Sequence, residues 1–180
     1  MAIRPILTAP DPRLKAKSRP VARVDDEVRR LMDDMLETMY AAPGIGLAAP
    51  QIGVAKRVIV IDLAKEGEPP QPYRFANPEL VWVSDEDMAA EEGCLSVPEH
   101  YAEVVRPRAI RVRYIDYQNE IRELEAEGIL ATCIQHEMDH LDGILFIDRL
   151  TALRRNIILR KLRKLKKADE REKSKVAAEG

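Results

Sequence analysis

Apolar residues recur every three or four positions in two stretches of the chain, as they do on the buried face of an α-helix. In the first stretch, 26–41, this face consists of Val28, Leu31, Met32, Met35, Leu36 and Met39. Asp25 stands immediately before it and can cap the first turn. In the second stretch, about 127–141, the apolar stripe contains Leu130, Ile134, Met138 and Leu141. We predict a helix over each stretch, and a last helix from near Thr151.

Other stretches have the pattern of β-strands. An apolar run predicts a buried strand at 57–63, and a second strand is expected at 80–83. Between 110 and 114, apolar residues alternate with Arg111 and Arg113, and Gln118-Asn119 is expected to turn the chain into a partner strand at 120–126. Strands joined by short turns and followed by separate helices favour an α+β fold with mostly antiparallel pairing.

The length and composition fit one globular domain. The chain has 180 residues, of which 46% are hydrophobic. We expect a single domain over 1–168 and a disordered charged tail over 169–180. No apolar run approaches the ~20 residues of a membrane span, and residues 1–13 lack the apolar core of a signal peptide. With only two cysteines, the chain is expected in the cytoplasm, without a Cys94–Cys133 disulfide.

Charge is concentrated at the C-terminal end. Residues 151–180 contain 11 Lys/Arg and 4 Asp/Glu, a net charge of +7. On a helix, one face would hold Arg160, Arg163, Lys164 and Lys167. This face is either an ordinary solvated surface or a docking surface for an anionic partner.

The sequence His-Glu-Met-Asp-His occupies positions 136–140. Histidines at i and i+4 lie one above the other on a helix, so both imidazoles can reach one metal ion. Glu137 lies beside them on a neighbouring line of the helix, where it is better placed to act on water than to bind the ion. The alternative is a buried helix whose histidines only satisfy hydrogen bonds. The chain has only three histidines, and two of them stand at this spacing, which favours the metal site.

The third ligand determines the class of metal site. Metzincin proteases place a third histidine six residues beyond the second, where this chain has Phe146. Other proteases use a downstream glutamate as the third ligand, and Asp148, Glu170 and Glu172 are available for that role. Cys94 is the better candidate, because a thiolate binds iron or zinc strongly and the glycine and serine around it suggest a tight turn. The alternative for Cys94 is an inert core residue.

A glycine-rich segment runs from Gly44 to Gln51. Its Gly-x-Gly-x-x-Ala pattern is found in dinucleotide-binding loops, which follow a strand and begin a helix. Here a helix pattern precedes the segment, a strand pattern follows it, and Pro50 interrupts the required helix. The segment is therefore interpreted as a loop that a substrate can approach closely, with the Gln51 amide as a hydrogen-bond donor.

Three segments, Gly44 to Gln51, Glu92 to Pro98 and Gln135 to Gly143, resemble the three signature motifs of the bacterial peptide deformylases, and the resemblance extends from about residue 3 to 165. It implies an enzyme that removes the formyl group from the formyl-methionine of nascent polypeptides. It also implies mixed sheets packed around the helix that carries the histidines. One divalent ion is expected, ferrous iron in the first place, with zinc, nickel or cobalt as replacements.

The resemblance also assigns roles to single residues. The metal ligands would be Cys94, His136 and His140. Metal-bound water would attack the formyl carbon with Glu137 as general acid and base. Gln51 and the Leu95 backbone N–H would stabilise the oxyanion. The substrate would be bound by Ile45, Gly46, Glu92, Ile129 and Cys133.

Two further expectations concern partners and specificity. Because family members use the C-terminal helix on the ribosome, the basic face of the last helix is a candidate ribosome contact. Some relatives have an arginine three residues after the proline of the second motif, whereas this chain has Tyr101. The sequence leaves open the role of this tyrosine.

Two other classes of function remain compatible with parts of the sequence. A small metalloprotease would share the metal and Glu137, but it would cleave unformylated internal peptide bonds. An RNA- or ribosome-binding module would need the basic segment but not three metal ligands. Both enzymes would contain a bound metal ion and this module would not, so the metal content of the purified protein distinguishes them.

Overall fold

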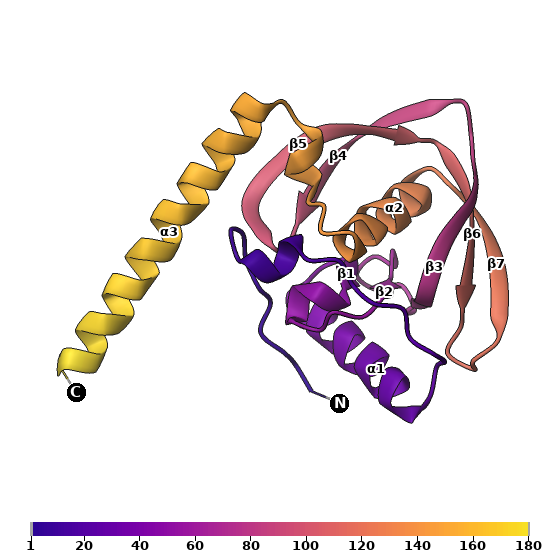
Figure 1. Ribbon diagram of the computed structural model, residues 1–180, viewed down its shortest axis with the longest axis horizontal. Coiled ribbons are helices and arrows are strands. Elements are labelled where there is room, and N and C mark those ends of the chain that lie inside the picture. The colour runs from indigo at the N-terminus through magenta and orange to yellow at the C-terminus, as the bar shows by residue number, and fades with distance from the viewer. Residues whose placement is uncertain (1, 180) are drawn as a thin grey trace.

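Two antiparallel sheets and three α-helices form an α+β fold, seen in a computed structural model that describes residues 2–179 (Figure 1). The larger sheet has the order β1-β2-β3-β6-β7 and consists of β1 (Gly46–Ala48), β2 (Val58–Ile61), β3 (Tyr73–Val83), β6 (Ala109–Ile115) and β7 (Ile121–Glu127). The smaller sheet is the hairpin of β4 (Asp87–Cys94) and β5 (Val97–Pro107). The helices are α1 (Asp26–Ala41), α2 (Ile129–Leu141) and α3 (Ala152–Glu179), with short 3-10 turns η1 (Pro12–Lys15), η2 (Ala49–Ile52) and η3 (Phe146–Arg149). The predicted fold class is confirmed.

Strand β2 shows how the larger sheet is buried on both faces. Successive side chains of a strand point to opposite faces. Val58 and Val60 pack into the apolar cluster that contains α1, whereas Ile59 and Ile61 pack into the cluster that contains α2. All four residues have no exposed surface, as the uninterrupted apolar run predicted. The sheet therefore separates α1 from α2.

Helix α1 has the predicted limits and cap. The Asp25 side chain accepts a hydrogen bond of 3.0 Å from the Val28 N–H in the first turn. Its apolar stripe is fully buried at Met32, Met35 and Met39. The stripe covers one face of the sheet and leaves the other face to α2.

Helix α2 lies between the larger sheet and the β4–β5 hairpin (Figure 1). Ala131, Ile134 and Leu141 are fully buried in the cluster that α2 shares with the sheet. On the hairpin side, a separate apolar cluster joins residues of β5 and η3 to Ile158 and Leu162 of α3. The predicted metal-binding helix is thus enclosed by two sheets, and its polar side faces the hairpin.

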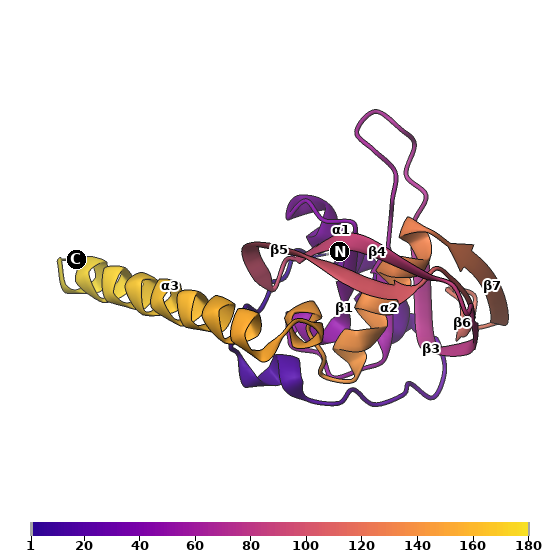
Figure 2. The same ribbon diagram turned by 90° about the horizontal axis from the view of Figure 1, so that it is seen from above.

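Helix α3 extends away from the body of the molecule (Figures 1 and 2). Its start confirms the helix predicted near Thr151. Residues 169–179 are its exposed continuation, and Gly180 lies outside the described residues. The division into a domain of 1–168 and a tail of 169–180 stays a prediction. No helix within residues 2–179 is both long enough and apolar enough to cross a membrane.

Four strands differ from the sequence prediction. β1 lies in the segment from Gly44 to Gln51, which was interpreted as a loop, but it pairs with β2. β3 begins at Tyr73, seven residues before the start expected for it. The β4–β5 hairpin was not predicted as strands at all, although it supplies Cys94. Acidic residues and alanines dominate β4, and they have low strand propensity.

Gly143 ends α2 in a conformation that a side chain would strain. Its φ is 74°, and an added Cβ would overlap the backbone carbonyl of Lys15. Gly67 also has a positive φ, 86°, but has open space around it. We predict that Gly143→Ala lowers the free energy of unfolding by about 2–5 kcal/mol, and Gly67→Ala by about 1–2 kcal/mol. Denaturant unfolding measures both, and equal losses would contradict the packing at Gly143.

Candidate metal centre

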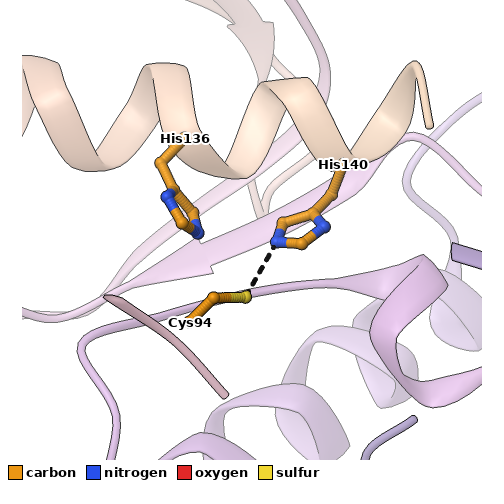
Figure 3. Close-up of side chains that lie close together, drawn as sticks. All are labelled: Cys94, His136 and His140. Atoms are coloured by element: carbon orange, nitrogen blue, oxygen red, sulfur yellow. Dashed lines mark hydrogen bonds between the residues drawn. The ribbon is translucent and has the colours of Figure 1, made fainter. Parts of the chain in front are cut away.

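Three potential metal ligands meet where α2 passes the end of β4. His136 and His140 project from successive turns of α2 toward Cys94, the last residue of β4 (Figure 3). The Cys94 Sγ lies 3.4 Å from the His140 Nε2. One donor atom from each of the three residues lies within 4.8 Å of the other two. The three ligands predicted from the sequence therefore form a cluster of one sulfur and two nitrogens.

Glu92 fixes the ring of His136 from the side opposite the cluster. Its carboxylate Oε1 lies 2.9 Å from the His136 Nδ1 and also accepts a hydrogen bond of 2.9 Å from Arg106. Arg106 Nε donates to the other carboxylate oxygen at 2.7 Å. Burial by itself raises the pKa of Glu92, but these hydrogen bonds outweigh it and lower the pKa to about 2. The ionised carboxylate leaves the His136 Nε2 free to face the cluster.

Arg106 also ties the hairpin to α2 and η3. Its Nη1 donates to Asp139 of α2 at 2.9 Å. The same carboxylate accepts two hydrogen bonds of 2.7 Å from Arg149 of η3. The Arg106 and Glu92 side chains are each only 4% exposed, so this is a buried ionic network. It holds β4, β5 and the histidine-bearing helix in one arrangement.

Glu137 places a buried carboxylate beside the cluster. Its Oε1 is 3.7 Å from the His136 Nε2, and its Oε2 is buried without a hydrogen-bond partner among residues 2–179. Burial raises the pKa of Glu137 to about 7. A Cβ added to Gly46 would lie 2.9 Å from Oε1, so the carboxylate packs where only glycine leaves room. A carboxyl group with this pKa can both accept and return a proton near neutral pH.

The cluster fits a divalent metal ion. Burial lowers the pKa of His140 well below its ordinary value, which keeps this imidazole neutral and able to bind a metal. Its Nδ1 is buried and has no hydrogen-bond partner in the described part of the chain. One thiolate and two imidazoles are donors that suit zinc and iron.

Gln51 lies against the cluster from the other side. Its Nε2 donates to the Ser96 hydroxyl at 3.0 Å and is 3.5 Å from the Cys94 Sγ. Its Oε1 accepts a hydrogen bond of 2.9 Å from the Ala48 N–H, which fixes the orientation of the amide. The Ser96 N–H points to the Cys94 Sγ at 3.4 Å. These contacts hold the cysteine, and Ser96 was not singled out from the sequence.

A groove of about 1020 Å³ leads to this cluster. It is lined by the five residues expected to bind the substrate, Ile45, Gly46, Glu92, Ile129 and Cys133, and by Gln51, Leu95 and Glu137. Ile45 and Ile129 are more than half exposed, so they form apolar walls at the mouth. Burial raises the pKa of the Cys133 thiol to about 12, so it stays neutral inside. All of the predicted site residues except His140 thus line one cavity.

Comparison with known proteins agrees with this geometry. The model of the polypeptide deformylase family matches residues 3–156. The chain belongs to this family. A peptide deformylase from Phenylobacterium zucineum is 63% identical over 168 residues, covering 93% of this chain and 99% of that protein. A crystal structure of peptide deformylase from Ehrlichia chaffeensis superposes with a TM-score of 0.88 at 41% identity, covering 93% of this chain and 99% of that one.

A second Ehrlichia chaffeensis structure, solved in complex with actinonin, has a TM-score of 0.87 and 43% identity, covering 91% of this chain and 98% of that one. Membership of the family makes the chain a hydrolase that acts on the N-formyl group of nascent peptides. The resemblance inferred from the three motifs is confirmed.

The buried network gives a stability prediction. Arg106→Ala would leave the buried carboxylate of Glu92 without its arginine partner and Asp139 with Arg149 alone, and we expect a loss of about 3–5 kcal/mol in the free energy of unfolding. Arg108→Ala is the matched control, because Arg108 pairs with Glu86 on the surface and its loss should cost less than about 1 kcal/mol. Denaturant unfolding of both variants measures the difference. Similar losses would show that the buried network does not hold the hairpin to α2.

Proposed function

We propose that the chain releases formate from the N-terminal formyl-methionine of nascent polypeptides, with a divalent metal ion held by Cys94, His136 and His140. The observation that carries this proposal is the buried carboxylate of Glu137 between these three donors and the groove, whose Oε2 has no hydrogen-bond partner among residues 2–179. Leaving a polar group buried and unpaired costs stability. It is retained, on this proposal, because the carboxylate acts on a substrate.

We further propose ferrous iron as the native ion, with zinc, nickel or cobalt as replacements. When bound, the ion would supply a Lewis acid that polarises the formyl oxygen and makes water easier to deprotonate. The mixed sulfur and nitrogen donors are compatible with each of these metals.

Glu137 would move the proton in this reaction. Its carboxylate can take a proton from water and then deliver it to the departing amine. The close contact with Gly46 limits the positions that this carboxylate can occupy. Because the group faces the groove, it can reach a substrate without a rearrangement of the helix.

Gln51 and Leu95 would stabilise the negative charge that develops on the formyl oxygen. A side-chain amide nitrogen carries two hydrogens, and Ser96 accepts one from Gln51. The second points to the Cys94 Sγ at 3.5 Å, a long contact, and on this proposal it would be donated to the oxyanion instead, together with the Leu95 backbone N–H. Removing one such donor typically costs about 3–4 kcal/mol of transition-state stabilisation.

The methionine side chain would lie against Ile45, Ile129 and Cys133, which offer apolar, uncharged surface. Gly46 and Glu92 would bind the substrate main chain. Because the Glu92 carboxylate is occupied by Arg106 and His136, its contact with the substrate would use backbone atoms. The complex of the Ehrlichia chaffeensis relative with actinonin suggests that compound as a probe of this groove.

Replacing Glu137 should separate catalysis from metal binding. We expect Glu137→Ala to retain about one metal ion per chain but to lose formate release by a factor of about 10²–10⁴. Cys94→Ala or His140→Ala should lose both the metal and the activity. Metal analysis of anaerobically purified protein and formate release from a formyl-Met peptide measure the two properties. Normal deformylation by Glu137→Ala would rule out its assigned role.

The basic face of α3 would dock the enzyme on the ribosome. Arg160, Arg163, Lys164 and Lys167 are exposed, and none of them forms an ion pair within residues 2–179. Phosphates of ribosomal RNA would supply the missing counter-charges. An enzyme that acts on nascent chains at the ribosome would be located in the cytoplasm.

This docking can be tested by reversing charges on the helix. Changing Arg160, Arg163, Lys164 and Lys167 to glutamate should abolish ribosome co-sedimentation at low salt, because each lost phosphate contact removes counterion release. Turnover of a short formyl-Met peptide should change less than twofold, because the groove contains no residue of α3.

The matched control reverses four other cations of α3 that lie off this face at 100° per residue, Arg154, Lys161, Lys166 and Lys173. It changes the net charge equally but should retain most of the ribosome binding. Equal co-sedimentation of wild type and both variants would leave the basic face as solvated surface.

A further inference from the structure

Asp62 binds both ends of one wall of the groove. This wall is the connection from α1 to β1, and its successive residues Ala42 to Ile45 all line the groove. At the start of the connection, the Tyr40 hydroxyl donates a hydrogen bond of 2.6 Å to the Asp62 carboxylate. At its end, the Ile45 carbonyl accepts a hydrogen bond of 2.9 Å from the Asp62 backbone N–H. One residue that follows β2 therefore holds the connection at both ends.

Ile45 depends on these anchors more than the residues that follow it. Gly46 belongs to β1 and is the register partner of Ile61, so the sheet holds it in place. The hydrogen bond between Ile45 and Asp62 extends this pairing by one residue, and the connection has left the sheet beyond it. The Ile45 side chain is 52% exposed, so packing alone fixes it poorly. Its position against a substrate follows from the position of the connection.

The Asp62 carboxylate is fixed by backbone donors as well as by Tyr40. Asp62 is only 4% exposed. Its Oδ1 accepts a hydrogen bond of 2.9 Å from the Ala64 N–H, and its Oδ2 accepts one of 3.2 Å from the Gln71 N–H. These donors lie near the two ends of the loop between β2 and β3, which projects from the body of the molecule (Figure 2). Burial by itself raises the pKa of Asp62, but the hydrogen bonds outweigh it and lower the pKa.

Tyr40 is attached mainly through its hydroxyl. Its side chain is 45% exposed and belongs to none of the three apolar clusters formed by residues 2–179. Burial of the hydroxyl and its hydrogen bond to Asp62 raise the pKa of Tyr40 to about 12, so the hydroxyl keeps its proton and stays a donor. A hydrogen bond to an ionised acceptor is stronger than one between neutral groups. This bond therefore ties the last turn of α1 to the end of β2.

From these contacts we propose that Tyr40 and Asp62 are positioning residues that hold the Ile45 wall of the groove against the methionine side chain of the substrate. The proposal rests on the proposed deformylase function and adds to it two residues that determine the preference for methionine. Neither residue lines the groove, so each acts through the connection between α1 and β1.

The test compares formate release from formyl-Met-Ala-Ser and formyl-Ala-Ala-Ser. A methylene group missing from an apolar pocket changes discrimination by about 10- to 200-fold, so displacing Ile45 without removing it should cost about fivefold. We expect Tyr40→Phe to raise KM for the methionine peptide by this factor and to leave kcat nearly unchanged. The ratio of kcat/KM for methionine over alanine should decrease equally, because an alanine side chain is too short to use the wall.

Tyr117→Phe is the matched control. The Tyr117 hydroxyl also donates to a carboxylate, that of Asp33 in α1, at 3.1 Å, but neither residue lines the groove or belongs to the connection. Each variant loses one hydrogen bond between a tyrosine hydroxyl and a carboxylate. Denaturant unfolding should therefore show similar losses of stability, whereas only Tyr40→Phe should lower the methionine-to-alanine ratio.

Asp62→Asn tests the acceptor of the same hydrogen bond. Asparagine keeps one carbonyl oxygen but turns an NH₂ group toward other donors. We expect it to lower the methionine-to-alanine ratio at least as much as Tyr40→Phe does. Combining the two changes should lower the ratio no further, because both break one contact. If Asp62→Asn does not fold, the comparison of Tyr40→Phe with Tyr117→Phe decides.

Ile45→Ala shows whether Tyr40 acts through this wall. Alone, it should lower the methionine-to-alanine ratio by about tenfold or more. In the Ile45→Ala background, Tyr40→Phe should have almost no further effect on the ratio, because the side chain that it positions is absent. Independent effects of the two changes, which multiply in the double variant, would contradict the proposal.

The outcomes separate this proposal from the function on which it rests. If the wild-type protein releases no formate from a formyl-Met peptide, the deformylase function fails. If the wild type is active but Tyr40→Phe and Tyr117→Phe give the same methionine-to-alanine ratio, only the positioning role is overturned. An equal rise in KM for both peptides in Tyr40→Phe would also overturn it.

Discussion

The buried pairing of Arg106 with Glu92 is the interaction on which the site depends. Arginine presents several N–H donors in one plane, so a single side chain can bind both oxygens of Glu92 and also reach Asp139. Burying these charges is costly unless every one of them is paired. Because Glu92 also orients His136, the same carboxylate links the hairpin to the metal-binding helix. The site therefore uses a rigid ionic network to support groups that are themselves left unpaired.

The helices and the buried strand of the fold follow from local patterns. Periodic methionines and the Asp25 cap predicted α1 within its observed limits, and the apolar run predicted β2. The β4–β5 hairpin could not be predicted in this way, because its structure depends on what packs beneath it. Ala102, Val104 and Arg106 alternate on its buried face, and the arginine at the third position conceals the strand pattern. The buried charge of Arg106 is tolerated there only because Arg106 forms ion pairs with Glu92 and Asp139.

The sequence predicted the site residues whose chemistry requires a fixed spacing along the chain. It was less informative about residues that come together only through tertiary contacts. The two histidines and Glu137 are adjacent in sequence, so helix geometry alone relates them. Cys94 was predicted as a ligand because a thiolate binds metals strongly, and the fold brings it to the two histidines. The role of Asp139 could not be predicted from the helix pattern, because its partners, Arg106 and Arg149, lie in other elements. A buried arginine in an alternating strand was the one local signal for this network.

The central claim is that a single metal ion held by Cys94, His136 and His140 is required for deformylation. The most direct measurement removes metal from the protein under anaerobic conditions and titrates cobalt back, while thiolate-to-cobalt absorption and formate release from a formyl-Met peptide are followed together. We expect no release from the metal-free protein, and both signals to rise together and saturate at one equivalent. Formate release by metal-free protein, or restored activity without the thiolate signal, would contradict the account.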